Sequence, residues 1–105
     1  KIDSACFLFS SLQENKKEFV LSKQVLRSGT AIGAMVKESE FAESKADFVH
    51  KLSIALKEAN ETKYWLLLLH ESEYLDDSSY ESVNEDCLNL IRLLVSIIKR
   101  MKCAA

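Results

Sequence analysis

The 105-residue sequence has no proline and only two glycines, Gly29 and Gly33. β-Sandwiches and barrels of this size need many tight turns, and tight turns depend on these two residue types. Their scarcity favours a few long helices joined by short polar links. Apolar residues make up 48% of the chain, and a chain of this length suits one hydrophobic core. We therefore predict a single all-α domain over residues 1–105.

Long apolar runs and paired cysteines are also missing. The longest apolar run, Tyr64 to Leu69, is far short of the roughly 20 residues that span a bilayer, and no signal-peptide pattern is present. The three cysteines, Cys6, Cys87 and Cys103, are widely spaced and form no C-x-x-C pair. This usage suits a reducing compartment, so we expect a cytoplasmic protein with no membrane partner.

Catalytic signatures are absent from the sequence as well. No glycine loop is present to cradle a phosphate, and Cys6 and Cys87 lie on apolar stripes, where a buried and inert thiol is the default. Asp47 and His50 have the carboxylate-x-x-His spacing of di-iron bundles, but such sites need a second element of this kind and two further carboxylates. We predict no enzyme, no cofactor and no small-molecule substrate, with a metal site at Asp47 and His50 as the weakest alternative.

Apolar residues recur at three- and four-residue steps, which predicts helices over residues 2–14, 16–40, 45–74 and 79–102. Capping pairs three residues apart mark the later starts: Asn15 with Glu18, Ser44 with Asp47, and Ser78 with Glu81. The short links predict an antiparallel up-and-down four-helix bundle. The expected core stripes are Ile2, Ala5, Cys6, Phe9 and Leu12, then Leu21, Val25, Ser28, Gly29, Ile32 and Val36, then Phe48, Leu52, Ala55, Leu56, Ala59, Leu66 and Leu69.

The fourth helix carries more apolar surface than one core requires. Between residues 87 and 98 only three residues are polar, so the apolar arc covers roughly 220°, against about 100° for a helix facing one core. Residues 64–69 pose the same problem in the third helix. Either the neighbouring helices wrap these flanks, or the flanks form a subunit interface. We expect a homo-oligomer whose candidate interface residues are Trp65, Leu68, Leu88, Leu93 and Val95.

Small residues interrupt the second helix at Ser28, Gly29 and Gly33. Each glycine costs a helix interior about 1 kcal/mol relative to alanine, so a compensating contact is expected. We predict that these three residues permit close packing of a neighbouring helix. A site where a ligand approaches the backbone is the alternative.

Charge is polarised along the chain, although the net charge is only -2. Residues 71–86 include seven acids and no Lys or Arg, whereas the segment from Arg92 onward has four bases and no acid. Complementarity to the helix dipole explains such a pattern. The alternative is a patch facing RNA or DNA, made of Lys99, Arg100 and Lys102, which Glu38, Glu40 and Glu43 would partly neutralise.

Two blocks of sequence resemble a known family. Residues 21–34 read LSKQVLRSGTAIGA, residues 42–48 read AESKADF, and the similarity continues through LSIALKEANET at 52–62 into YWL at 64–66. The chain thereby resembles the bacterial four-helix bundle proteins of the 23S ribosomal RNA intervening-sequence family, often labelled ribosomal proteins. The resemblance implies a barrel-like pentamer and no catalytic residues. A related branch, the accessory protein of diversity-generating retroelements, binds nucleic acid and a reverse transcriptase but is strongly basic, unlike this chain.

Three function hypotheses follow. The first is a non-catalytic oligomeric scaffold or adaptor that contacts RNA or DNA. The second is a direct nucleic-acid-binding module, acting on ribosomal RNA or in a retroelement complex, that adds Lys16, Lys17 and Lys23 to the three bases near the C-terminus. The third is the metal-binding bundle at Asp47 and His50.

Overall fold

A computed structural model describes residues 2–16 and 18–103, with side chains for residues 6–14 and 18–103. The first helix, α1 (Ile2–Ser11), continues into a turn of π-helix, η1 (Leu12–Lys16). Three longer helices follow: α2 (Val20–Ser39), α3 (Lys45–Glu71) and α4 (Asp77–Cys103). The described residues contain no strand. The predicted all-α, four-helix architecture is confirmed.

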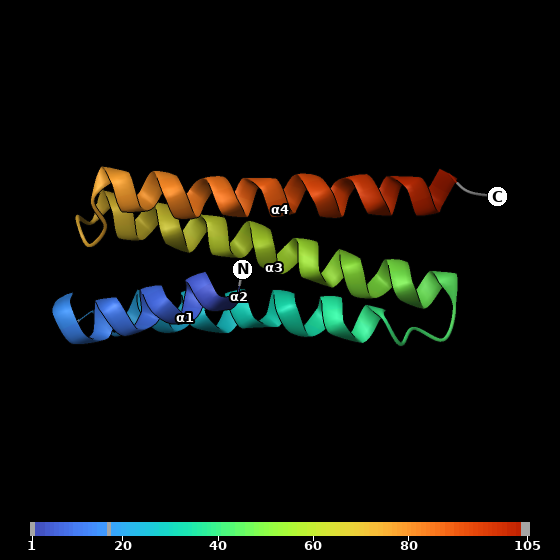
Figure 1. Ribbon diagram of the computed structural model, residues 1–105, viewed down its shortest axis with the longest axis horizontal. Coiled ribbons are helices and arrows are strands. Elements are labelled where there is room, and N and C mark those ends of the chain that lie inside the picture. The colour runs from blue at the N-terminus through green and yellow to red at the C-terminus, as the bar shows by residue number, and fades with distance from the viewer. Residues whose placement is uncertain (1, 17, 104–105) are drawn as a thin grey trace.

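The helices form an elongated bundle of 49 × 21 × 17 Å. Helix α3 lies between α2 and α4 and runs antiparallel to both, while α1 packs on α2 (Figure 1). Helix α1 has 10 residues, against 20 in α2 and 27 in each of α3 and α4. Because α1 is so short, it covers only the first part of α2. The fourth position of the bundle is therefore filled along part of its length.

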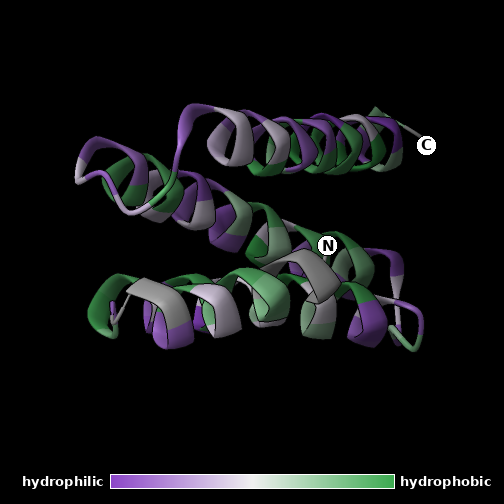
Figure 2. Ribbon diagram, turned by 60° about the vertical axis from the view of Figure 1, so that its left-hand side comes forward, coloured by the Kyte–Doolittle hydropathy of each residue, from purple (hydrophilic) through white to green (hydrophobic). Residues whose placement is uncertain are grey.

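The apolar side chains form two core clusters. In Figure 2, green marks the apolar residues, which gather on the sides of the helices that face one another. The first cluster includes Leu8 of α1 and Leu12 of η1, whereas the buried residues described for the second cluster lie on α2, α3 and α4. The core stripes predicted for α2 and α3 are confirmed. The buried members are Leu8, Leu12, Val25, Leu66, Leu69, Leu75 and Cys87 in the first cluster, and Ile32, Leu52, Ala55, Ala59, Leu94 and Ile98 in the second.

The stripe predicted for α1 is wrong in part. Leu8 and Leu12, one helical turn apart, are buried, whereas Cys6 is exposed and Phe9 is half-buried. Leu8 and Leu12 pack in one cluster with Val25 of α2 and with Leu66 and Leu69 of α3, so Leu8 takes the place predicted for Phe9. The side chains of Ile2 and Ala5 lie outside the described residues.

Glu18, not Asn15, fixes the start of α2, which begins at Val20 rather than at Lys16. The Glu18 carboxylate accepts hydrogen bonds from the backbone N–H groups of Val20, Leu21 and Ser22, at 3.1, 2.9 and 2.7 Å. These N–H groups have no partner within the helix, and a carboxylate is also favoured by the helix dipole at this end. Asn15 instead lies within η1.

The predicted cap of α3 is confirmed, because the Ser44 hydroxyl accepts a hydrogen bond from the Asp47 N–H at 3.0 Å. The cap predicted at Ser78 for α4 is wrong. The Asp76 carboxylate accepts from the Ser79 N–H at 2.7 Å, so Asp76 takes the capping position and α4 begins at Asp77, two residues early.

Helix α3 ends at Glu71, three residues before its predicted end. The Tyr74 N–H donates to the Leu69 carbonyl at 2.9 Å and the Glu73 N–H donates to the His70 carbonyl at 3.1 Å. Glu73 has a φ of 65°. These bonds form a Schellman motif, in which a left-handed residue terminates the helix. Glycine usually occupies that position, and the absence of a glycine here left the end of α3 unmarked in the sequence.

Candidate functional site

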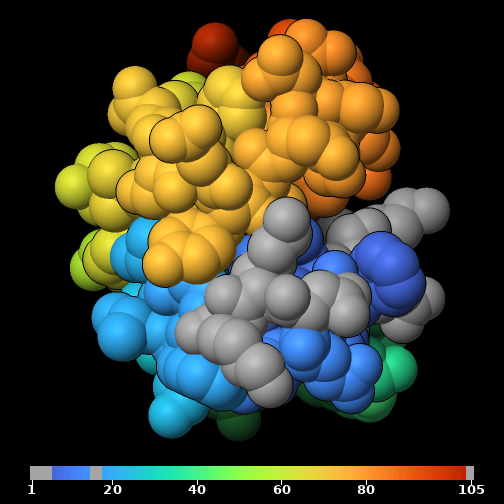
Figure 3. Space-filling model, turned by 90° about the vertical axis from the view of Figure 1, so that its left-hand side faces the viewer, coloured from blue at the N-terminus to red at the C-terminus, as the bar shows by residue number. Residues whose placement is uncertain are grey.

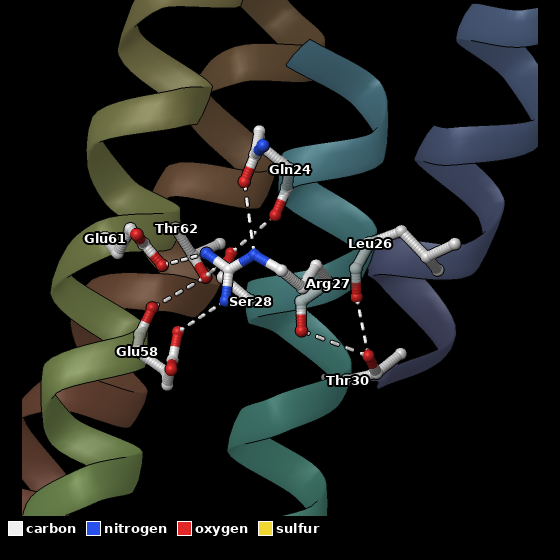
Figure 4. A network of polar contacts seen from close by, with 8 residues as sticks. All are labelled: Gln24, Leu26, Arg27, Ser28, Thr30, Glu58, Glu61 and Thr62. Atoms are coloured by element: carbon white, nitrogen blue, oxygen red, sulfur yellow. Dashed lines mark hydrogen bonds and ion pairs between the residues drawn. The ribbon is translucent and has the colours of Figure 1, made fainter. Parts of the chain in front are cut away.

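Arg27 and Ser28 of α2 join this helix to α3 through two layers of polar contacts (Figure 4). In the outer layer, Arg27 donates from Nη1 to Glu58 at 3.4 Å and from Nη2 to Glu61, while its Nε donates to Gln24 at 3.1 Å. The hydrogen bond from Arg27 is the main cause that lowers the pKa of Glu61. It also raises the pKa of Arg27. The groups are exposed, so solvent screens much of this attraction.

The ion pair between Arg27 and Glu61 predicts that its contribution to the free energy of unfolding depends on pH. Because the folded-state pKa of Glu61 is lowered, the pair stabilises the fold above the ordinary glutamate pKa of about 4.3 and loses its effect as the pH falls. Arg27→Met keeps the alkyl chain and removes the charge. Urea unfolding should show a stability gap between wild type and variant at pH 7 that narrows by pH 3. A gap of equal size at both pH values would contradict this assignment.

The inner layer consists of two buried hydroxyls. The Ser28 hydroxyl donates to the Gln24 carbonyl at 2.9 Å. The Thr62 hydroxyl donates to the Ser28 oxygen at 2.7 Å and also lies 2.8 Å from the Glu58 carbonyl, so its single hydrogen is shared between two acceptors. The contacts join α2 and α3 at close range, and neither hydroxyl adjoins a group that would activate it as a nucleophile. This site is suited to structure rather than to chemistry.

An open apolar groove of about 590 Å³ lies beside this contact. We call it the α2–α4 groove; Thr62 and Leu66 of α3 also line it. Gly29 and Gly33 border it on the α2 side, and because glycine has no side chain, these two residues do not fill the groove. Of the three small residues predicted to pack closely, Ser28 makes the contact to α3, and the two glycines line the groove. The remaining lining residues are Val25, Ile32, Val36, Lys37, Glu40, Val83, Asp86, Cys87, Asn89, Leu90 and Leu93.

The five predicted interface residues do not form one patch. Leu93 lines the α2–α4 groove and is 53% exposed. Leu88 and Val95 are half-buried and do not line the groove; at about 100° per residue they fall on the opposite flank of α4. Trp65 and Leu68 of α3 are also half-buried, and Trp65 packs against the first core cluster. The prediction thus combined two separate flanks.

Sequence reasoning missed several exposed apolar side chains on α1, around the start of α2 and in the α2–α3 connection. They are Phe7, Phe19, Val20 and Phe41. Tyr64 and Leu67, in the apolar run at 64–69 that the sequence already marked, are exposed as well.

The bases Lys99, Arg100 and Lys102 are exposed in the last turns of α4. Within the described part of the chain none of them forms an ion pair. Two of the acids expected to neutralise them have lysine partners instead, at 3.1 Å from Glu38 to Lys51 and 3.9 Å from Glu40 to Lys37. Of the additional bases in the second hypothesis, Lys23 is exposed near the start of α2, and the side chains of Lys16 and Lys17 lie outside the described residues.

A second cavity, of about 830 Å³, opens where the α3–α4 connection meets α1, at the end shown in Figure 3. His70 Nε2 lies 2.8 Å from Asp77 Oδ1, and the His70 ring stacks on Tyr80 at 4.2 Å. These contacts hold the end of α3 against the start of α4. The same cavity is lined by Glu73, Asp76 and Asp86.

The remaining titratable candidates do not assemble into a reaction centre. The Asp47 carboxylate accepts a hydrogen bond from the Glu43 N–H at 3.2 Å, and His50 is exposed. Among the described residues, no three His, Cys, Asp or Glu side chains are placed to share a metal ion. Burial raises the pKa of the Cys87 thiol, whose sulfur donates to the Ala59 carbonyl at 3.3 Å. In the same described part, no helix has the length and apolar character needed to cross a membrane.

Comparison with known proteins identifies the family. Residues 3–96 match the family described as 23S rRNA-intervening sequence protein. The chain belongs to that family. A similar solved structure is the crystal structure of a protein with unknown function from the S23 ribosomal protein family of Bacteroides thetaiotaomicron. It is 54% identical, with a TM-score of 0.92, and the match covers 93% of this chain and 88% of that chain. No curated protein matches the chain.

Membership of the 23S rRNA-intervening sequence family assigns no reaction to the features above. Neither of the two descriptions names an enzyme or a ligand. The matched segment includes the contacts of Arg27, Ser28 and Thr62 and every residue that lines the α2–α4 groove. It ends at residue 96, before Lys99, Arg100 and Lys102. The candidate basic patch therefore lies outside the part of the chain that matches the family.

Proposed function

We propose that this protein is a non-enzymatic scaffold or adaptor that works as a homo-oligomer. The observation that carries the proposal is the open α2–α4 groove, whose lining is mostly apolar. Exposed apolar surface of this kind marks association sites in proteins. The half-buried flank at Leu88 and Val95 adds a second apolar surface on α4. The resemblance stated above implies five subunits.

The test is the absolute mass of the protein in solution, measured by light scattering after size exclusion at micromolar concentration. We expect a multiple of the 11.9 kDa chain mass. The same run reports co-eluting nucleic acid through its absorbance ratio. A single-subunit mass across the concentration range would overturn the proposal.

A second candidate is direct nucleic-acid binding by the last turns of α4. The observation that favours it is the exposure of Lys99, Arg100 and Lys102 without ion-pair partners in the described chain. Binding to a ribosomal RNA fragment, followed by fluorescence anisotropy, should weaken steeply with salt as counterions are released. Lys99→Gln with Lys102→Gln should reduce the salt slope, whereas Lys63→Gln, at an exposed lysine of α3 outside the predicted contact set, is the control. Binding that does not respond to salt, or no binding, would exclude this candidate.

A further inference from the structure

The outer side of α3 carries three exposed side chains at intervals of seven residues, Lys57, Tyr64 and Glu71, which we call the α3 stripe. At 3.6 residues per turn they fall on one face of the helix. Thr62 of the same helix lines the α2–α4 groove, and Tyr64 lies about 160° round the helix from it. The α3 stripe and the groove therefore open on different sides of the bundle, and one chain presents both surfaces at once.

The groove side of α4 carries a second set with the same interval, which we call the α4 stripe. Asp86 and Leu93 line the groove, Arg100 follows Leu93 by seven residues, and all three side chains are exposed. In chain order the α3 stripe runs base, aromatic, acid, whereas the α4 stripe runs acid, apolar, base. The two stripes therefore have equal spacing and opposite signs at each end.

The four charges of the two stripes form no ion pair within the part of the chain that the structure describes. If the two stripes lie side by side with the helices parallel, each charge meets one of opposite sign. An antiparallel arrangement would instead place base against base and acid against acid, which is unfavourable. The charges thus select one direction.

We propose that the α3 stripe of one copy of this chain packs along the α4 stripe of the next copy, with the two helices parallel. The ring of Tyr64 then meets Leu93 at the centre of the contact. Two helices whose contact residues share a seven-residue interval stay in register along their length. The charge pairs on either side are Lys57 with Asp86 and Glu71 with Arg100.

The α2–α4 groove explains why Leu93 can serve as the centre. Leu93 and Leu90 line the groove from α4, and Gly33 lines it from α2. Since Gly33 has no side chain, it leaves space that the aromatic ring of a neighbouring copy can enter. Tyr64 is 55% exposed and Leu93 is 53% exposed in the single chain. The contact removes apolar area of both from water, which drives association.

This pairing rests on the proposed self-association and identifies the two surfaces that meet. The stripes are different surfaces of the same chain, so the contact is head-to-tail, and every copy uses its α3 stripe on one neighbour and its α4 stripe on another. Head-to-tail contacts build closed rings when the rotation between copies closes. A ring of five, which the family resemblance implies, is built in this way.

Tyr64→Asp and Leu93→Asp each place a carboxylate at the centre of one stripe. Either change should raise the dissociation constant of the contact by about 100-fold, as at a central interface residue. The light-scattering mass at a fixed micromolar concentration should fall to that of one chain, 11.9 kDa. Circular dichroism should show an unchanged helix content, because both side chains are exposed. Phe41→Asp removes an exposed apolar side chain in the α2–α3 connection and should leave the mass unaltered.

Mixing the two variants tests the head-to-tail geometry. The Tyr64→Asp chain keeps an intact α4 stripe, and the Leu93→Asp chain keeps an intact α3 stripe, so one contact can form between them and no further copy can add. An equimolar mixture should therefore give a complex of two chains, although each variant alone has the mass of one. An interface made of the same surface on both copies gives no such complex.

Charge exchange tests the parallel direction. Lys57→Asp alone and Asp86→Lys alone each place like charges opposite one another and should weaken the contact by about tenfold. The double variant carrying both changes restores opposite charges, and its mass should return to that of the wild type. Antiparallel helices or an unrelated interface give no such rescue, because Lys57 and Asp86 then do not meet.

The outcomes separate this inference from the proposed function. A wild-type oligomer whose mass Tyr64→Asp or Leu93→Asp leaves unchanged overturns the pairing of the two stripes and leaves the scaffold proposal standing. A mixture of these variants that stays at the mass of one chain, or a double charge variant as weak as the single variants, also overturns the pairing alone. A wild-type protein that is monomeric at every concentration overturns both.

Discussion

Replacing Leu66 with alanine should lower the free energy of unfolding by about 3 kcal/mol. The Leu66 side chain is 0% exposed and belongs to the core cluster that unites α1 with the three long helices. Truncation removes apolar contacts and leaves a void between helices that cannot close fully. In urea denaturation the loss should appear as a lower midpoint concentration of urea, with an unchanged slope of the unfolding free energy against urea concentration.

The adjacent residue provides a matched control for Leu66. Leu67 is the same residue type in the same helix, but it is 39% exposed. Leu67→Ala should lower the free energy of unfolding by well under half as much as Leu66→Ala, because folding removes less apolar area of Leu67 from water. Equal losses at the two positions would mean that the described face of α3 is not the one that packs in the folded protein.

Glu18→Ala is expected to destabilise the fold by about 2 kcal/mol, since three backbone N–H groups lose their charged acceptor. Glu18 is 7% exposed, so water replaces the carboxylate poorly. Its backbone carbonyl also accepts a hydrogen bond from the Ser22 hydroxyl at 2.7 Å, a bond that the variant keeps. Thermal unfolding measures the effect.

An exposed glutamate nearby tests whether this loss reflects capping. Glu14 lies in η1 and is exposed, and Glu14→Ala should change the stability by only a few tenths of a kcal/mol. Glu18→Gln should fall between wild type and Glu18→Ala, because the amide oxygen accepts hydrogen bonds without the charge. A Glu18→Ala variant as stable as Glu14→Ala would contradict the capping role.

The helix starts show how far local sequence determines structure. Ser44 and Ser78 carry the same spacing to an acid three residues later, yet only Ser44 caps its helix. Asp76 precedes Ser78 by two residues and accepts the Ser79 N–H first, so the local competition between two good caps decided the outcome. The capping pair at Asn15 failed for a similar reason, because Glu18 satisfies the N–H groups of the next turn alone.

The candidate surfaces were harder to predict than the core. Periodicity identified Val25, Ile32, Leu52 and Leu66 because a buried stripe repeats with the helix. It also marked Leu93 as surplus to one core, which its exposure bears out. It could not tell which flank of α4, that of Leu93 or that of Leu88, would stay more exposed, since this depends on how the long helices are spaced. Those distances are set by contacts between segments far apart in sequence, such as Ser28 with Thr62.

The shortness of α1 has a consequence for how the native state opens. Helix α1 contributes Leu8 and η1 contributes Leu12 to the buried core, and among the side chains that the structure describes neither element contributes to the second cluster. Cooperative units with few buried apolar contacts open at lower free energy than the whole protein. Release of this N-terminal unit would uncover Leu66 and Leu69 while α2, α3 and α4 keep their shared contacts. The bundle thus comprises a three-helix unit and a detachable N-terminal segment, and partial unfolding begins at the end where the two meet.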